Sequence, residues 1–190
     1  MARIILASNS PRRRELLAGL GVEFTVDTLN TFEEVFDPST PHVEVPALMS
    51  RGKSHGFHRP LGQDEVLVTS DTMVLVDKII MGKPRSREEA VGMLRALSGR
   101  GHEVITAVTV RDCRREETRQ DCTVVHFKPL SDNEIDYYVD TFRPYDKAGA
   151  YGIQEWIGYV GITGIEGSYF NVMGFPVHLV YSMLKEFGAV

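Results

Sequence analysis

A serine-rich turn runs into three consecutive arginines near the start of the chain, at residues 8–14 (Ser-Asn-Ser-Pro-Arg-Arg-Arg). Ser10 is a suitable helix N-cap and Pro11 a favoured first helical residue, while the apolar run at residues 3–7 is typical of a buried strand. Cations are unfavourable at a helix amino terminus unless an anion binds there. Backbone N–H groups, hydroxyls and guanidinium groups all suit phosphate, so this segment indicates a phosphate site. The alternative is three solvated surface arginines.

A single carboxylate, Asp71, interrupts the apolar run at residues 66–76. A carboxylate among buried strand residues must be paired, hydrogen-bonded, protonated or metal-bound, because burying it alone is costly. Close to a phosphate site it could hold a divalent cation or activate a water molecule. It could equally be a turn aspartate at the end of a strand.

Two glycine-containing segments carry further polar residues. Residues 82–84 (Gly-Lys-Pro) place Lys83 in a turn, which is not a Walker A loop because Pro84 stands where that loop requires Ser or Thr. Residues 145–154 are dense in glycine and alanine, which lets the backbone approach a ligand or another segment closely. The segment ends at Gln154, whose amide offers the acceptor and donors needed to recognise the edge of a base.

The elements that position these residues follow from the hydrophobic pattern and the capping signals. Strands are predicted at residues 3–7, 22–28, 66–76, 104–110 and 122–127. Helices are predicted to start at Ser10, at the capping boxes of Ser86 and Ser131, and at Pro176. Residues 44–55 are a weaker helix prediction, because Gly52 costs about 1 kcal/mol relative to alanine. The charged residues 111–121 predict a long solvated turn, and the alternation predicts an α/β or α+β class with a mixed sheet.

Composition limits the classes of function. The 190 residues carry a formal net charge of −5, which argues against general nucleic-acid binding. Two cysteines are too few for a disulfide framework, and no stretch approaches the roughly 20 apolar residues of a membrane span. The apolar run at the start is too short for a signal peptide. We therefore expect a single soluble, cytoplasmic domain with no nucleic-acid or membrane partner.

Taken together, the motifs resemble the Maf family, over nearly the whole chain from Ile4 to about Phe187. They occur in the family's order: Ser8-x-Ser10-Pro11-Arg12-Arg13, Asp71-Thr72, Gly82-Lys83-Pro84, Ser98-Gly99-x-x-His102-x-Val104-x-Thr106, and residues 146–154. The resemblance implies a two-lobed α/β fold, similar to that of inosine triphosphate pyrophosphatases, with an elongated mixed sheet flanked by helices. It also implies one domain over residues 1–190 with a central cleft between the lobes, a divalent cation (Mg, Mn or Co) and a homodimer.

The resemblance also implies roles for individual residues. Asp71 matches the family's proton acceptor, and the positions that match its specificity residues are Arg12, Thr72 and Gln154. Polar residues lining the same cleft are matched by Ser8, Arg13, Glu33, Lys53 and Lys83. Asp71 with Glu33 is predicted to hold the metal, although the sequence does not separate metal ligand from base.

Two positions depart from the family pattern. Ser70 stands where alanine is common and would add a hydroxyl beside Asp71, and Glu155-Trp156 follows Gln154 where many members have glycine. The segment ending in Gln154 resembles the subgroup that acts on dTTP and UTP, whereas the 7-methyl-GTP subgroup typically differs there. We therefore expect hydrolysis of dTTP and UTP to the monophosphate and pyrophosphate by metal-assisted attack of water at the α-phosphorus. The alternatives are a pyrophosphatase for a modified or 7-methylguanosine nucleotide and a non-catalytic, septum-related nucleotide-binding protein.

Overall fold

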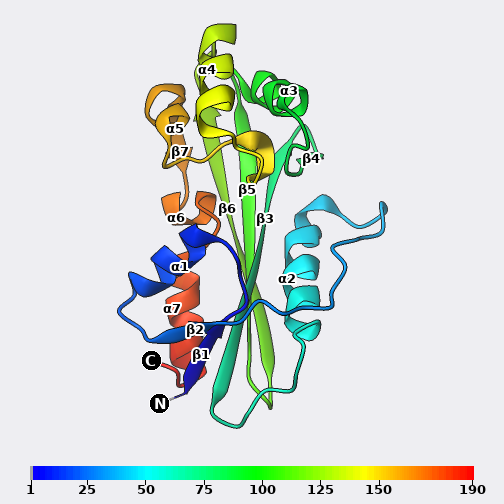
Figure 1. The fold of residues 1–190 in the computed structure, drawn as a ribbon, viewed down its shortest axis with the longest axis vertical. Helices are drawn as coiled ribbons and strands as arrows, with labels where there is room; N and C mark the ends of the chain where they lie inside the picture. The colour runs from blue at the N-terminus through cyan, green and yellow to red at the C-terminus, as the bar shows by residue number, and fades with distance from the viewer. Residues whose placement is uncertain (1) are drawn as a thin grey trace. The chain divides into compact units, whose positions relative to one another are not determined.

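The computed structural model describes residues 2–190 and has one mixed sheet with helices packed on it (Figure 1). The strands are β1 Arg3–Leu6, β2 Phe24–Val26, β3 Glu65–Val76, β4 Ile79–Met81, β5 Gly101–Arg111, β6 Glu116–Phe127 and β7 Ile162–Glu166. Their order is β2-β1-β3-β5-β6-β7, and β4 pairs with β3. β1 is parallel to β2 and β3, whereas β4 and β7 are antiparallel to β3 and β6 respectively. The predicted mixed α/β sheet is therefore confirmed.

The helices alternate with the strands along the chain. They are α1 Pro11–Ala18, α2 Val45–His55, α3 Arg87–Leu97, α4 Asp132–Phe142, α5 Trp156–Gly161, α6 Tyr169–Val172 and α7 Val177–Glu186, with 3-10 turns η1 His42–Glu44 and η2 Ala148–Ala150. Within residues 2–190, no helix is both long enough and apolar enough to cross a membrane.

The chain divides into two compact units. Unit 1 comprises residues up to Asp71, Thr106–Asp121 and Gly174–Val190, and unit 2 comprises Thr72–Ile105 and Cys122–Met173. The strands β3, β5 and β6 each contribute residues to both units. A single domain with a central cleft remains a prediction.

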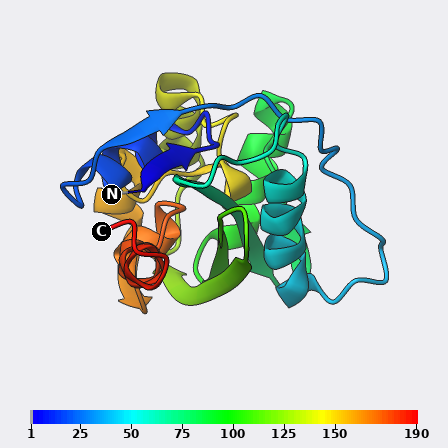
Figure 2. The same ribbon diagram turned by 90° about the horizontal axis from the view of Figure 1, so that it is seen from below.

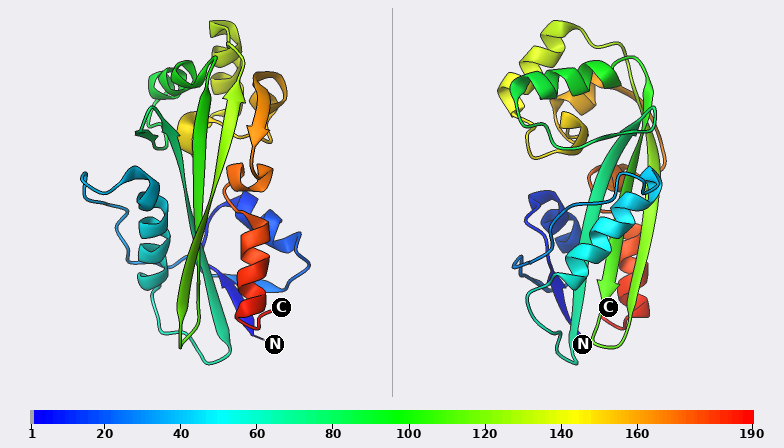
Figure 3. Two further views of the ribbon diagram at one scale, coloured as in Figure 1. Left: turned by 180° about the vertical axis from the view of Figure 1, so that it is seen from behind. Right: turned by 90° about the vertical axis from the view of Figure 1, so that its right-hand side faces the viewer.

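In unit 1, the alternation of side chains along the strands gives the sheet two different faces. The side chains of Leu6 and Val68 pack with Leu17 of α1 and Val180 of α7 in one apolar cluster. Ile5, Leu67 and Phe57 form a separate cluster on the opposite face, which α2 covers. Figures 2 and 3 show α2 and α7 on opposite sides of these strands.

In unit 2, α3 and α4 pack on one another and on the sheet (Figure 1). Leu94 of α3, Ile135 and Tyr138 of α4 join Val104 and Val125 of the strands in a single buried cluster. The turn η2 adds Ala150 to the same core. This packing holds the glycine-rich segment at residues 145–154 against the sheet.

Capping hydrogen bonds confirm the predicted helix starts at Ser10, Ser86 and Ser131, although the predicted box at Ser86 is incomplete because the Glu89 carboxylate accepts the N–H of Arg85; α7 begins directly after Pro176 without a side-chain cap. Ser10 and Ser86 accept backbone N–H groups of α1 and α3, and Ser131 with Glu134 forms a complete capping box at α4. Residues 44–55 do form a helix, and the structure explains Gly52. A Cβ at Gly52 would lie 2.2 Å from the ring of Phe32, so only glycine allows this ring to pack on α2.

The prediction of a long solvated turn at residues 111–121 is wrong. β6 begins at Glu116, and the turn between β5 and β6 is only residues 112–115. The charged side chains of this stretch lie on a regular strand because they find partners there. Arg119, for example, bonds with both Glu117 and Glu186. Ion pairs across neighbouring elements therefore allow a charged segment to remain in the sheet.

Candidate active site

The arginine-rich start of α1 is the first part of the site, in unit 1. β1 ends at Leu6, and the turn that follows brings two serines onto the backbone of α1. The hydroxyl of Ser8 accepts the N–H of Ser10 at 3.2 Å, and the hydroxyl of Ser10 accepts the N–H of Arg13 at 3.4 Å. The first turn of α1 contains no acidic residue. Positive charge from the helix amino terminus is therefore reinforced by the arginines rather than neutralised.

Arg13 ties α1 to two distant segments of unit 1. Its Nη1 donates to the carbonyl of Ser70 at 2.7 Å, and its Nε donates to the carbonyl of Gly174 at 2.9 Å. Burial lowers the pKa of Arg13 from its usual value, and the nearby Asp71 carboxylate opposes this effect. Arg12, the preceding residue of α1, is partly exposed. The structure thus gives Arg13 a bridging contact that the sequence did not predict.

The predicted catalytic carboxylate of Asp71 is paired, which was one of the alternatives that the sequence left open. Its Oδ1 lies 2.6 Å from Nζ of Lys53, which projects from α2. The side chains of Asp71 and Lys53 are only 13% and 19% exposed. A close pair at this burial fixes both groups in position, so Lys53 and Asp71 are the predicted site residues most clearly brought together.

A second carboxylate reaches Lys53, and it belongs to Glu34 rather than Glu33. Oε1 of Glu34 lies 3.1 Å from Nζ of Lys53, and both Glu33 and Glu34 are exposed. The amide of Asn30 donates to the carbonyl of Lys53 at 2.6 Å, which holds this loop against α2. Sequence reasoning missed Glu34 because residues 31–41 have no helical or strand periodicity to indicate which side chain reaches α2. The role of Glu33 as a metal ligand stays a prediction.

Within residues 2–190, no three or more His, Cys, Asp or Glu side chains form a group that could hold a metal ion.

Ser70, one of the two departures from the family pattern, does not turn its hydroxyl toward Asp71. Its Oγ donates to the carbonyl of Gly174 at 3.4 Å. Neighbouring strand residues point to opposite faces, so the Ser70 side chain faces Gly174 while Asp71 faces α2.

In unit 2, the predicted site residues lie on two connected loops and on β3. Thr72 is partly buried on β3, and Lys83 is exposed in the turn after β4. The N–H of Gly149 donates to the carbonyl of Gly82 at 3.1 Å, so the loop that carries Lys83 is bonded to the segment at residues 145–154. Gly149 has φ of +68°, and a Cβ there would lie 3.1 Å from the methyl groups of Val74. Glycine is therefore required at this contact.

Gln154 presents a polar atom without a protein partner. Its Oε1 is buried and accepts no hydrogen bond from the described residues. A buried acceptor without a donor is unfavourable by about 1–3 kcal/mol, which a ligand N–H would offset. The use of this amide for recognising a base stays a prediction.

The second departure from the family pattern, Glu155, is the counter-ion of a buried lysine. Its carboxylate lies 3.0 Å from Nζ of Lys147 and also accepts the hydroxyl of Tyr138. The same Tyr138 oxygen accepts the N–H of Gly152 at 3.0 Å. Burial and the adjacent carboxylate raise the pKa of Tyr138, so it remains a donor. Sequence reasoning noted Glu155 but missed its partners, because Lys147 and Tyr138 are 8 and 17 residues away along the chain.

His102, a residue of the fourth family motif, is a buried hydrogen-bonding group. Its Nε2 lies 2.7 Å from the hydroxyl of Tyr151, and its ring stacks on Phe127. Burial lowers its pKa to about 4, with a smaller contribution from His126. The ring is therefore neutral at physiological pH and acts as a core hydrogen-bonding group.

Comparison with known proteins identifies the family of the chain. The chain is 47% identical over 184 residues to the dTTP/UTP pyrophosphatase of Phocaeicola vulgatus, which covers 97% of this chain and 95% of that protein. It is 49% identical over 190 residues to the dTTP/UTP pyrophosphatase of Porphyromonas gingivalis, covering 98% of this chain and 94% of that protein. Among solved structures, a HAM1 protein from Coxiella burnetii is similar in fold, with a TM-score of 0.50, 15% identity and coverage of 98% and 100% of the two chains. The family model described as Maf-like protein matches residues 3–187, and the chain therefore belongs to the Maf family.

Proposed function

We propose that this protein hydrolyses dTTP and UTP to the nucleoside monophosphate and pyrophosphate. Relatives named dTTP/UTP pyrophosphatase share 46–49% of its residues over nearly the full length. The observation that carries the proposal is the close contact of Asp71 with Lys53, in the same unit as the cationic start of α1. A carboxylate held in place among cations is suited to hydrolysis of an anionic substrate.

The cations of the site neutralise the triphosphate. Arg12, at the amino-terminal end of α1, binds phosphate oxygens through its guanidinium group and the helix adds its own positive end. Lys83 contributes a flexible ammonium, and Thr72 and Ser8 contribute hydroxyls. Pyrophosphate becomes a good leaving group once its charge is neutralised, so binding and catalysis use the same groups.

Asp71 acts on the attacking water. Lys53 donates to one carboxylate oxygen of Asp71, and this contact also fixes the direction of the other oxygen. That carboxylate orients the water in line with the α-phosphorus and accepts its proton as the bond to pyrophosphate breaks. The leaving pyrophosphate carries the displaced electron pair, and the monophosphate gains the oxygen of the water.

A divalent cation would be held beside Lys53, by carboxylate oxygens that its ammonium does not engage. Asp71 and Glu34 both present carboxylate oxygens there, and Mg²⁺ is usually bound through one or two carboxylates together with substrate phosphates. These two residues, with Glu33 as the sequence predicts, would hold Mg, Mn or Co. Such an ion would supply charge neutralisation and make water more acidic. The concentration of Mg²⁺ for half-maximal activity should rise more in Glu34→Gln than in Glu33→Gln if Glu34 is the ligand, and full turnover in EDTA would contradict the metal altogether.

Gln154 distinguishes the base. Uracil and thymine present an N3–H donor beside a carbonyl acceptor, which an amide can match by accepting from N3–H and donating to O4. The buried, unpartnered Oε1 of Gln154 is the acceptor that this edge requires. Recognition of both UTP and dTTP follows, because the edge is the same in the two bases.

A nucleotide panel tests the proposal. Purified protein is incubated with UTP, dTTP, CTP, GTP, ATP and 7-methyl-GTP, and pyrophosphate is measured by release of phosphate with and without inorganic pyrophosphatase. We expect UTP and dTTP to be the preferred substrates and phosphate to appear only with the coupling enzyme. Reaction in H₂¹⁸O should place the label in the monophosphate, and a label in pyrophosphate would rule out attack at the α-phosphorus.

The predicted homodimer rests on the family resemblance. Size-exclusion chromatography with light scattering at the concentrations of the activity assay tests it, and a mass near the 21.3 kDa of one chain would contradict it.

A further inference from the structure

Two successive contacts join α2 to β3 in unit 1. The first is a pair of hydroxyl contacts between Ser50 and Thr69, and the second is the ion pair between Lys53 and Asp71. Residues three apart on a helix are neighbours, and residues two apart on a strand share a face. The two contacts are therefore adjacent on the same helix face and the same strand face.

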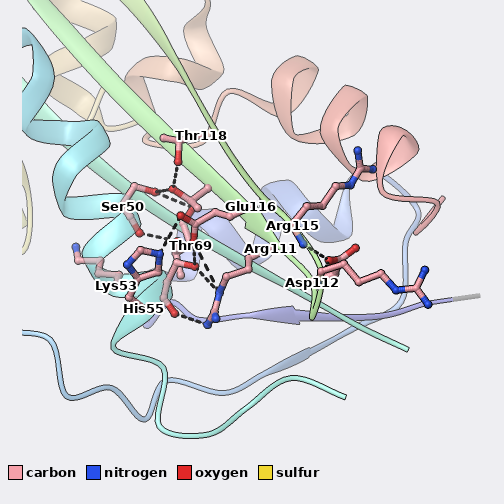
Figure 4. Close-up of polar contacts among 12 residues, drawn as sticks. Ser50, Lys53, His55, Thr69, Arg111, Asp112, Arg115, Glu116 and Thr118 are labelled. Carbon is pink, nitrogen blue, oxygen red and sulfur yellow. Dashed lines mark hydrogen bonds and ion pairs between the residues drawn. The ribbon is translucent and has the colours of Figure 1, made fainter. Parts of the chain in front are cut away.

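The Ser50 and Thr69 contact is reciprocal, as Figure 4 shows. The hydroxyl of Ser50 donates to the carbonyl of Thr69 at 3.3 Å, and the hydroxyl of Thr69 donates to the carbonyl of Ser50 at 2.8 Å. Both residues are fully buried. Two bonds in opposite directions fix both the distance between helix and strand and the sliding of one along the other.

Two more hydroxyls extend this contact across the sheet. Thr109 of β5 lies 2.8 Å from the hydroxyl of Ser50, and Thr118 of β6 lies 2.9 Å from the hydroxyl of Thr109. Either hydroxyl can be the donor in each of these two contacts. The contacts connect Ser50 to the next two strands of the sheet.

We propose that Ser50 and Thr69 are positioning residues for the proposed hydrolysis. They set the register of α2 on β3 and so hold Lys53 against Asp71. The inference rests on the proposed function and adds to it two residues that do not contact the substrate. Neither residue was among the site residues expected from the sequence.

The hydroxyls at this interface contribute direction as well as stability. Their acceptors are main-chain carbonyls, which substitution of Ser50 and Thr69 leaves in place, so removing the hydroxyls should lower stability modestly. Alanine at Ser50 and valine at Thr69 would keep the packing nearly unchanged. What they would lose is directionality, because apolar contacts allow sliding that paired hydrogen bonds forbid. Loss of position at a reacting group can lower the rate on the order of 100-fold.

The test uses the double variant Ser50→Ala/Thr69→Val, with kcat and KM for UTP measured well below the melting temperature. We expect kcat to fall on the order of 10–100-fold while KM changes little, because Lys53 and Asp71 are displaced but the phosphate-binding arginines are not. Urea denaturation should show a modestly lower midpoint, with the protein still folded under the conditions of the assay. The single variant Thr69→Ser, which keeps the hydroxyl, should have a kcat close to that of the wild type.

Thr118→Val is the matched control, because it removes another hydroxyl of this hydrogen-bonded series, one that bonds to Thr109 of β5 rather than to α2 or β3. Its kcat should stay at the wild-type value. The decisive comparison repeats Ser50→Ala/Thr69→Val in a Lys53→Met background, where the proposal predicts no further loss of kcat. An independent, multiplicative loss there, or wild-type kcat in Ser50→Ala/Thr69→Val itself, would overturn the positioning role. Failure of the wild type to hydrolyse any nucleotide would instead reject the proposed function, so the two failures are distinguishable.

Discussion

Lys147 and Glu155 form an ion pair at 3.0 Å in unit 2, with side chains only 9% and 19% exposed. The pair closes the glycine-rich segment on itself around Gly152, where a Cβ would lie 2.9 Å from the Glu155 carboxyl carbon and 3.0 Å from Cε of Lys147. Nε2 of Gln154 would lie 3.1 Å from the same Cβ. The ion pair and Gln154 therefore converge on one backbone position.

Breaking this pair should destabilise the protein. Glu155→Gln leaves Lys147 largely buried with only the carboxylate of Asp146, which is 58% exposed. We expect a loss of about 3 kcal/mol in the free energy of unfolding, measured by urea denaturation. Asp146→Asn is the matched control on the same lysine and should cost less than about 1 kcal/mol, because an exposed partner contributes little. Equal losses in the two variants would contradict the buried role of Glu155.

Asp71→Asn should nearly abolish turnover without unfolding the protein. The substitution removes the base but leaves Glu34 as a carboxylate partner for Lys53. We expect kcat to fall by on the order of 10²–10⁴, the usual range for a positioned acid or base. Circular dichroism and the melting temperature verify folding. Wild-type kcat in a folded Asp71→Asn protein would mean that Asp71 has a structural role only.

Arg12→Ala should weaken binding of the triphosphate without lowering the stability of the protein. Loss of a charge-assisted contact to the triphosphate should lower kcat/KM by a factor that corresponds to roughly 1.5–3 kcal/mol. The melting temperature should hold or rise slightly, because a cation is removed from a helix amino terminus. The opposite result, a lower melting temperature with unchanged kcat/KM, would identify Arg12 as an ordinary structural residue.

Variants of Gln154 should change base preference rather than overall rate. Gln154→Ala should lower kcat/KM for UTP and dTTP much more than for CTP, since a matched polar contact in a buried pocket is lost. Gln154→Glu should be worse for UTP, because a carboxylate cannot donate to O4. Competition assays with mixed nucleotides measure the ratio directly. An equal loss for every nucleotide would show that the base is recognised elsewhere.

His102 should make stability depend on pH between about 6.5 and 4. Its folded-state pKa of about 4 lies below the ordinary value of 6.5, so the unfolded chain binds a proton first as the pH falls. The stability contribution is complete above pH 6.5 and is lost down to about pH 4, where the loss reaches roughly 3 kcal/mol. His102→Gln, which retains a polar partner for Tyr151, should flatten the curve of unfolding free energy in this window. An unchanged curve would contradict the buried neutral state of His102.

The amino-acid sequence by itself determined the elements whose signals are local. The start of α1 at Pro11 and the capping box at Ser131 depend on hydrogen bonds within one turn of chain, so residue types and spacing suffice to predict them. The order of the motifs likewise identified the family, and with it the expected roles of Asp71 and Gln154.

The tertiary structure decided every contact that depends on packing between distant segments. Glu34 reaches Lys53 only because Phe32 packs on Gly52, and Thr69 meets Ser50 only because α2 lies on one particular face of β3. No local pattern encodes such contacts, since they join residues 19 or more positions apart through a specific helix and strand register. Side-chain direction in a loop and the register between elements are set by the whole packed core, and they become visible only when that core has formed.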